Sequence, residues 1–191
     1  MESDTQASER GALPELQPLD AGGTATLHLN RAWRSGGEIW LLTHAGKPVG
    51  MLKRAAGRTT LRTASEEWRG GVRRRRRRLG WHLYFARARG GETGLQYYPS
   101  TLLPGGDFVV SGSRRYRLRH RLVGADWRLA ARPGGEVGRI GARGPWRYLS
   151  VELTSVEYAV DEPVLLIVIL AAIEAILIDK ERPSGLDGAW G

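Results

Sequence analysis

The chain contains no cysteine among its 191 residues. This absence excludes disulfide bonds, thiolate zinc sites, cysteine nucleophiles and palmitoylated cysteines. Lysine is scarce as well, because only three of the 29 basic residues are lysines. Arginine therefore supplies most of the formal net charge of +9, and its planar guanidinium group suits bidentate contacts with phosphate and carboxylate. A GC-rich genome would produce the same bias, so composition alone does not establish an anion-binding surface.

No catalytic motif occurs in the chain. It lacks a nucleophile elbow, a P-loop, a G-x-G-x-x-G fingerprint and an H-E-x-x-H zinc motif. The four histidines are scattered, without the spacing of metal ligands. Neighbouring acidic residues such as Glu66 and Glu67 do not set two carboxylates at the separation that glycosidases require. We therefore expect a non-enzymatic protein with no cofactor and no metal.

We expect no secretory signal peptide, because residues 1–20 are acidic and contain no apolar core. We interpret residues 1–21 as a disordered acidic segment. Residues 161–191 carry an excess of acidic side chains too, so the positive charge is concentrated in the body of the chain. A basic body indicates anionic partners such as nucleic acid, phosphoinositides or an acidic membrane surface.

From residue 22 onward, short runs of alternating apolar and polar residues are separated by glycine-rich turns. Examples of the runs are "EIWLLTH", "GWHLYFARA" and "WRLAA", and examples of the turns are "AGKP", "RGGE" and "RPGG". Period-two alternation is typical of half-buried strands. Turns about every 8–12 residues indicate an antiparallel sandwich or barrel, so we predict an all-β fold of about 12 strands with one C-terminal helix.

The only long apolar run, "PVLLIVILAAIEAILI", covers residues 163–178. A helix of this length spans about 24 Å, which is short of the ~30 Å hydrocarbon core of a membrane. Glu174 lies inside the run and disfavours a membrane span. A barrel of about 12 strands leaves an interior that its own side chains do not fill. We therefore predict that helix 162–179 fills the barrel, where Glu174 needs a partner or a raised pKa. A tail-anchored protein with 163–178 as the span is the alternative.

Two consecutive patterns near the C-terminus carry a family resemblance. A long strand pattern, "RYLSVELTSVEYAV", is followed by the acidic and apolar segment "DEPVLLIVILAAIEAILID". This order resembles the tubby C-terminal superfamily, and within it the LURP-one-related and phospholipid-scramblase-like proteins. The resemblance covers residues 22–180 and implies a closed antiparallel β-barrel around a central hydrophobic helix, followed by a flexible tail, 181–191. It implies membrane association or phosphoinositide binding for some members, but it transfers no site residue to this chain.

Six consecutive arginines follow the Gly70–Gly71 pair. They are Arg73, Arg74, Arg75, Arg76, Arg77 and Arg78. In a strand, alternate members would face the core, where three guanidinium groups would lack partners. We therefore expect an exposed hairpin loop. This loop is either a site for acidic lipid headgroups or a solvated, self-repelling connection.

A second arginine pattern lies in "SRRYRLRHRLV". Its alternation places Arg115, Arg117, Arg119 and Arg121 on one face of a strand and Tyr116, Leu118, His120 and Leu122 on the other. Four arginines in file form an anion-binding ridge. The alternative is an ordinary polar face neutralised by acidic residues on neighbouring strands.

These patterns favour a cytoplasmic protein that binds anionic lipid at the inner face of a membrane through its arginines. Nucleic acid is the alternative ligand, because aromatic residues such as Trp81, Tyr84 and Phe85 stand near Arg87 and Arg89. Base-stacking aromatics beside a cationic groove are typical of single-strand binders. Loss of affinity with salt does not separate the two ligands, but competition between vesicles and oligonucleotides does.

Overall fold

The computed structural model describes residues 13–19, 25–34, 37–74, 81–89, 93–100, 103–111, 114–120, 126–142, 148–153 and 162–181. These residues contain twelve strands and one helix. The strands are β1 (Ala25–Arg34), β2 (Gly37–His44), β3 (Lys47–Ala55), β4 (Arg58–Thr63), β5 (Glu67–Arg74), β6 (Trp81–Arg87), β7 (Thr93–Pro99), β8 (Gly105–Val110), β9 (Arg114–His120), β10 (Asp126–Arg132), β11 (Glu136–Ala142) and β12 (Tyr148–Leu153). The helix is α1 (Glu162–Glu181).

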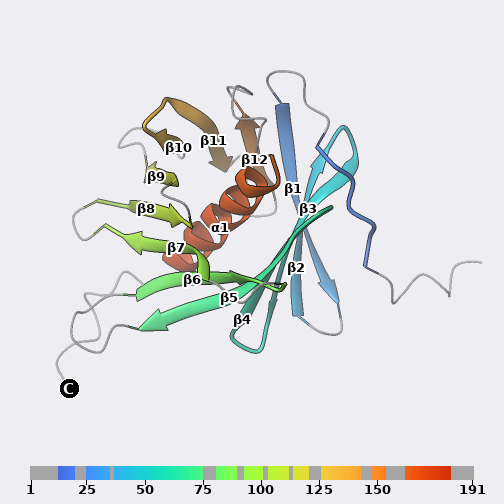
Figure 1. Ribbon diagram of the computed structural model, residues 1–191. Helices are drawn as coiled ribbons and strands as arrows, with labels where there is room; N and C mark the ends of the chain where they lie inside the picture. The colour runs from blue at the N-terminus through green and yellow to red at the C-terminus, as the bar shows by residue number, and fades with distance from the viewer. Residues whose placement is uncertain are drawn as a thin grey trace, which may run out of the picture.

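The twelve strands form one closed antiparallel barrel in which every strand pairs with its neighbours in sequence. The barrel closes where β1 pairs with β12, with Leu27 opposite Val151. Figure 1 shows the strands surrounding the single helix. Closure removes the unpaired edges that an open sheet would expose. The predicted all-β fold of about 12 strands around a C-terminal helix is therefore confirmed.

Two of the hairpin turns consist of the same pair of residues, Ala-Gly. Ala45 and Gly46 connect β2 to β3 with φ angles of 48° and 78°, and Ala56 and Gly57 connect β3 to β4 with φ angles of 46° and 75°. Two successive positive φ angles define the type I′ turn, whose twist matches that of the flanking strands. These Ala-Gly pairs therefore set the register of three consecutive strands.

Helix α1 runs through the interior of the barrel (Figure 1). Every residue from Val164 to Ile178 is buried, and the central residues Ile167 to Ile173 have no exposed surface. The helix extends two residues past the predicted end at residue 179. No helix among the described residues is long and apolar enough to cross a membrane. The burial of its side chains makes the apolar run part of the core of the barrel.

The helix lies closest to β3 and β4. Leu170 packs against β3, because a Cβ built at Gly50 would lie at an ordinary van der Waals distance of 3.4 Å from its Cδ1. Glu174, one turn further along the helix, meets β3 and β4 on the inner wall of the barrel.

Glu174 is 2% exposed and has two partners on the barrel wall. Thr59 of β4 donates a hydrogen bond from Oγ1 to Oε1 at 2.8 Å. Arg54 of β3 places its Nε 3.2 Å from Oε2. The same guanidinium group binds Glu181 at the end of the helix, with 2.7 Å between Nη2 and Oε2, and lies 3.3 Å from Glu38 of β2. Arg54 therefore ties the helix to the wall through the two helix carboxylates Glu174 and Glu181, and Glu38 of the neighbouring strand binds the same guanidinium group.

Burial raises the pKa of Glu174 above its ordinary value, against the opposing effects of Arg54 and Thr59. The partner and the raised pKa expected for a buried Glu174 are thus both present. The hydrogen bond from Arg54 lowers the pKa of the more exposed Glu181. Arg54 itself has a raised pKa, chiefly because of its bond to Glu181. The arginine therefore stays charged throughout the pH range in which carboxyl groups titrate.

The N-terminal segment differs from the prediction. Residues 1–21 were expected to be disordered, but residues 13–19 lie on the barrel. Leu16 is buried against Ile39 and Met51 on the outer face of β2 and β3. The Gln17 amide donates a hydrogen bond of 2.8 Å to the Pro48 carbonyl. The outer surface of β2 and β3 carries an apolar patch, and Leu16 covers it. The acidic composition of the N-terminal segment gives no sign of this contact.

Candidate functional site

The arginines of β9 alternate with its core residues as the sequence predicts. Tyr116 and Leu118 are buried, whereas Arg115 and Arg119 are exposed and Arg117 is half-buried. The first three members of the predicted ridge therefore share the outer face of one strand. Arg121, the fourth member, lies outside the described residues.

Neighbouring strands add arginines that the single-strand pattern does not predict. Arg128 and Arg132 of β10 alternate with the buried Trp127, Leu129 and Ala131, so they face outward. The outward position on β11 is held by Arg139, which lies between buried neighbours. We call the outer surface of Arg115, Arg117, Arg119, Arg128, Arg132 and Arg139 the arginine face. The "RPGG" turn is the sequence signal for this arrangement. It predicts that the strands on either side of it pair as a hairpin, which places their outward arginines side by side.

Acidic neighbours neutralise part of the arginine face. Arg117 forms two hydrogen bonds with Asp107 of β8, of 2.7 Å from Nε and 3.0 Å from Nη2. Glu136 forms ion pairs with both Arg128 and Arg139. Among the described residues, Arg115, Arg119 and Arg132 form no ion pair. The predicted cross-strand neutralisation is therefore real but incomplete.

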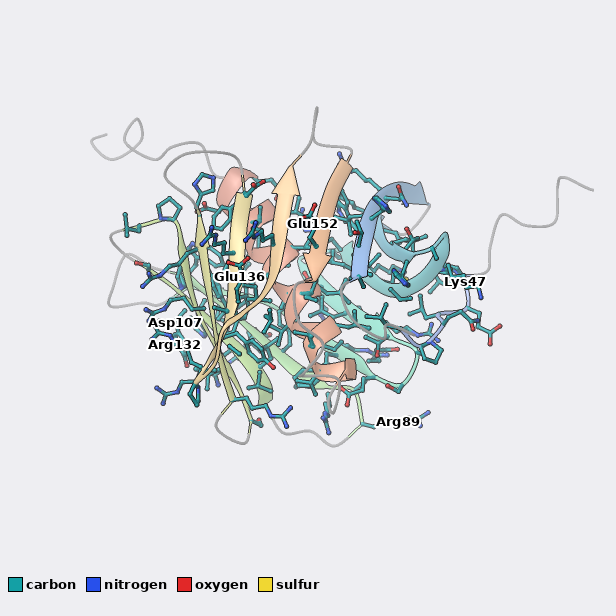
Figure 2. All side chains as sticks on the ribbon, turned by 90° about the horizontal axis from the view of Figure 1, so that it is seen from above. Lys47, Arg89, Asp107, Arg132, Glu136 and Glu152 are labelled. Atoms are coloured by element: carbon teal, nitrogen blue, oxygen red, sulfur yellow. The ribbon has the colours of Figure 1, made fainter. Side chains whose placement is uncertain are left out.

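The pKa of Asp107 shows the effect of the positive charges on the arginine face. The hydrogen bond from Arg117 lowers that pKa below its ordinary value of 3.8, and the charges of Arg132 and Arg119 add to the effect. A lowered pKa means that the ion pair contributes stability above the ordinary value and loses it as the pH falls through the lowered one. In Figure 2, Asp107 and Arg132 lie side by side on the same flank of the barrel. Several guanidinium groups thus act on one carboxylate.

The barrel register sets arginines directly opposite one another. Arg115 faces Arg132 and Arg119 faces Arg128 across β9 and β10. Arg128 in turn faces Arg139 across β10 and β11. Like charges at such positions repel, because directly opposed Cβ atoms are about 4.5–5.5 Å apart. The free protein therefore holds positive charge close together on this flank.

The arginine run at 73–78 begins inside a strand. Arg73 and Arg74 belong to β5, opposite His82 and Trp81 of β6, so the prediction of a loop is wrong for these two residues. The Arg73 guanidinium lies on the outer side, with its central carbon 3.9 Å from the centre of the Tyr84 ring. Stacking on an aromatic ring stabilises an exposed arginine in a strand. Residues 75–78 lie outside the described residues.

Most aromatic residues considered for base stacking lie in the core. Trp81, Phe85, Tyr97 and Trp127 are each at most 7% exposed. The half-buried Tyr84 ring is already covered by Arg73. These rings are therefore not available as a stacking platform next to the arginine face. Within the described ranges, no three acidic or histidine side chains form a group that could hold a metal ion.

Comparison with protein-family models, with curated proteins and with solved structures finds no match for this chain. The resemblance to the tubby C-terminal superfamily therefore stays a prediction. The barrel that surrounds a helix is established by the structure itself.

Proposed function

We propose that this protein binds anionic phospholipid headgroups at the cytoplasmic surface of a membrane through its arginine face. The supporting observation is the direct opposition of Arg115 with Arg132 and of Arg119 with Arg128 across neighbouring strands. Their repulsion costs free energy in the unbound barrel, and contact with a negatively charged surface removes that cost. The tubby-like resemblance points toward the same class of ligand.

An array of guanidinium groups on the outer surface of the barrel, without stacking aromatics beside it, suits headgroup phosphates better than it suits nucleic acid. Single-strand binders combine a cationic groove with stacking aromatics, and the aromatic residues here are mostly buried. A membrane surface requires charge and little else from the protein, at about 1 kcal/mol per basic residue near an anionic bilayer. The exposed Arg115 and Arg119 are positioned to make such contacts.

The double variant Arg115→Gln/Arg119→Gln tests this proposal. We expect its affinity for vesicles of phosphatidylcholine and phosphatidylserine to fall by roughly fivefold per arginine removed. The readout is co-sedimentation at low salt, with vesicles of phosphatidylcholine alone as the blank. The matched control is Lys47→Gln/Arg58→Gln, which removes the same charge from exposed positions on β3 and β4. In Figure 2, Lys47 lies across the barrel from Arg132.

Asp107→Asn provides the opposite test, because it releases Arg117 from its ion pair. We expect this variant to bind the same vesicles severalfold more tightly than the natural sequence. Equal losses in the face variant and in the control would show that net charge alone drives binding. Displacement of the protein from vesicles by oligonucleotides, but not by inositol phosphates, would instead favour nucleic acid.

A further inference from the structure

A cavity of about 620 Å³ lies beside the β4–β5 turn and the turn that follows β6. Four arginines line it, together with hydroxyl groups and two glutamates. The arginines are Arg62 of β4, Arg69 of β5, Arg87 of β6 and Arg89 of the following turn. Pockets of about 300–1,000 Å³ accommodate small ligands. This cavity therefore has the size of a small-molecule site and a strongly cationic lining.

One wall of the cavity is held by a fixed group of three side chains. Trp68 is 1% exposed, and its indole Nε1 donates a hydrogen bond of 2.6 Å to Glu66. The other oxygen of Glu66 lies 3.0 Å from Nη2 of Arg87, which also stacks over the Trp68 ring. Glycine at position 94 of β7 lets the indole lie this close, because a Cβ there would be 2.3 Å from the ring. Arg87 is thus preorganised.

The β4–β5 turn shapes the floor of the cavity. Thr63 donates its amide to the Glu66 carbonyl at 2.8 Å, and its Oγ1 accepts a hydrogen bond of 3.1 Å from the Glu66 amide. The Glu67 carboxylate binds Arg69, with 2.6 Å to Nη2. The carbonyl of Glu67 accepts a hydrogen bond of 2.8 Å from the amide of Ala88, which joins this turn to the end of β6. Hydrogen bonds therefore connect the strands and turns that carry the four arginines.

Charge is left over in the cavity. Glu66 and Glu67 are committed to Arg87 and Arg69, whereas Arg62 and Arg89 have no ion pair with any residue that the structure describes. Two spare guanidinium groups match the two negative charges of a phosphate monoester, and arginine binds phosphate through paired N–H donors. We propose that this cavity binds a small molecule that carries a phosphate-monoester group.

The lining favours a soluble ligand over a bilayer. The exposed large apolar residues among those described are Leu13, Val72 and Leu103, and none of them lines the cavity. The cavity is separate from the arginine face, since Figure 2 shows Arg89 well apart from Asp107 and Arg132. We therefore expect the cavity and the arginine face to bind different ligands, each through its own arginines.

The test compares Arg62→Gln/Arg89→Gln with Arg115→Gln/Arg119→Gln, which removes the same charge elsewhere. Inorganic phosphate and glucose 6-phosphate are titrated into each full-length protein by calorimetry, and binding to phosphatidylserine-containing vesicles is measured in parallel. We expect the cavity variant to lose roughly tenfold or more in affinity for glucose 6-phosphate. We expect the face variant to retain that affinity, and the cavity variant to retain its binding to vesicles.

Two outcomes overturn the inference. If the natural sequence shows no saturable binding of either phosphate compound, the cavity is not a phosphate site. If the cavity variant and the face variant lose vesicle binding equally, the cavity belongs to a membrane-contacting surface. Loss of vesicle binding in the face variant alone, without any phosphate binding, would preserve the proposed lipid function and reject only the cavity. Thermal unfolding of each variant provides the check on folding.

Discussion

Replacing Arg54 with leucine is expected to lower the free energy of unfolding by about 3–5 kcal/mol, because it leaves the buried Glu174 carboxylate without its ion-pair partner. Glu174 is 2% exposed, and Arg54 is its ion-pair partner on the barrel wall. Leucine would also release Glu181 and Glu38 from the same guanidinium group. Urea denaturation, followed by circular dichroism, measures the loss.

The control variants identify the buried charge as the cause. Arg58→Leu removes an exposed arginine from the neighbouring strand and should change the free energy of unfolding by less than about 0.5 kcal/mol. Adding Glu174→Leu to Arg54→Leu should restore most of the loss, since a buried ion pair can be replaced by apolar residues at little cost. An equal loss in the double variant would show that Arg54 acts through packing rather than through charge.

The loss in Arg54→Leu should also depend on pH. Burial raises the pKa of Glu174 and Arg54 lowers it, so removing Arg54 raises that pKa further above the ordinary value of 4.5. A group whose pKa is raised on folding contributes its stability below the ordinary value, and that stability is lost as the pH rises through the raised one. The penalty of Arg54→Leu is therefore expected to be smallest in acid, where Glu174 is neutral, and to grow toward neutral pH.

Ile169→Asp is expected to abolish cooperative folding. Ile169 lies at the middle of α1 with no exposed surface. An aspartate there would bury an unpaired charge. Such a change costs more than about 4 kcal/mol, which is a large part of the free energy of unfolding of a typical domain. Scanning calorimetry should show no unfolding transition for this variant.

Two milder changes serve as controls for Ile169→Asp. Ile169→Val removes one buried methylene group and should cost about 0.5–1.5 kcal/mol. Asp179→Asn changes an exposed residue on the same helix and should shift the free energy of unfolding by no more than about 0.5 kcal/mol. A normal transition temperature in Ile169→Asp would mean that the helix is not packed inside the barrel.

The sequence predicts the architecture well because local signals agree with one another. The alternation of apolar and polar residues in runs such as "GWHLYFARA", the glycine-rich turns and the apolar run at 163–178 all indicate a barrel with a filled interior. The sequence does not predict the partner of Glu174. Arg54 lies 120 positions earlier in the chain, and nothing in its local pattern distinguishes it from other strand arginines. Only the closed sheet brings the two together.

The candidate site shows the same division between local and distant information. Period-two alternation predicts the shared face of Arg115, Arg117 and Arg119, but the arginines opposite them depend on the register between strands. Burial of inward guanidinium groups disfavours a strand through the whole of 73–78, but it does not prevent a strand from including the start of the run. Arg73 lies on the outside of β5, over the Tyr84 ring. Leu16 likewise binds a patch that no local pattern reveals.

Hydrogen exchange of the intact protein tests the central claim, that α1 is the core of the barrel. The account predicts that amides from Leu166 to Ile178, beyond the first turn of the helix, exchange only through global unfolding, with the same free energy as buried strand amides such as that of Leu83. Exchange of the helix amides long before those of the strands would contradict it. In that case the barrel would be stable without its helix, and the apolar run would need another place to be buried.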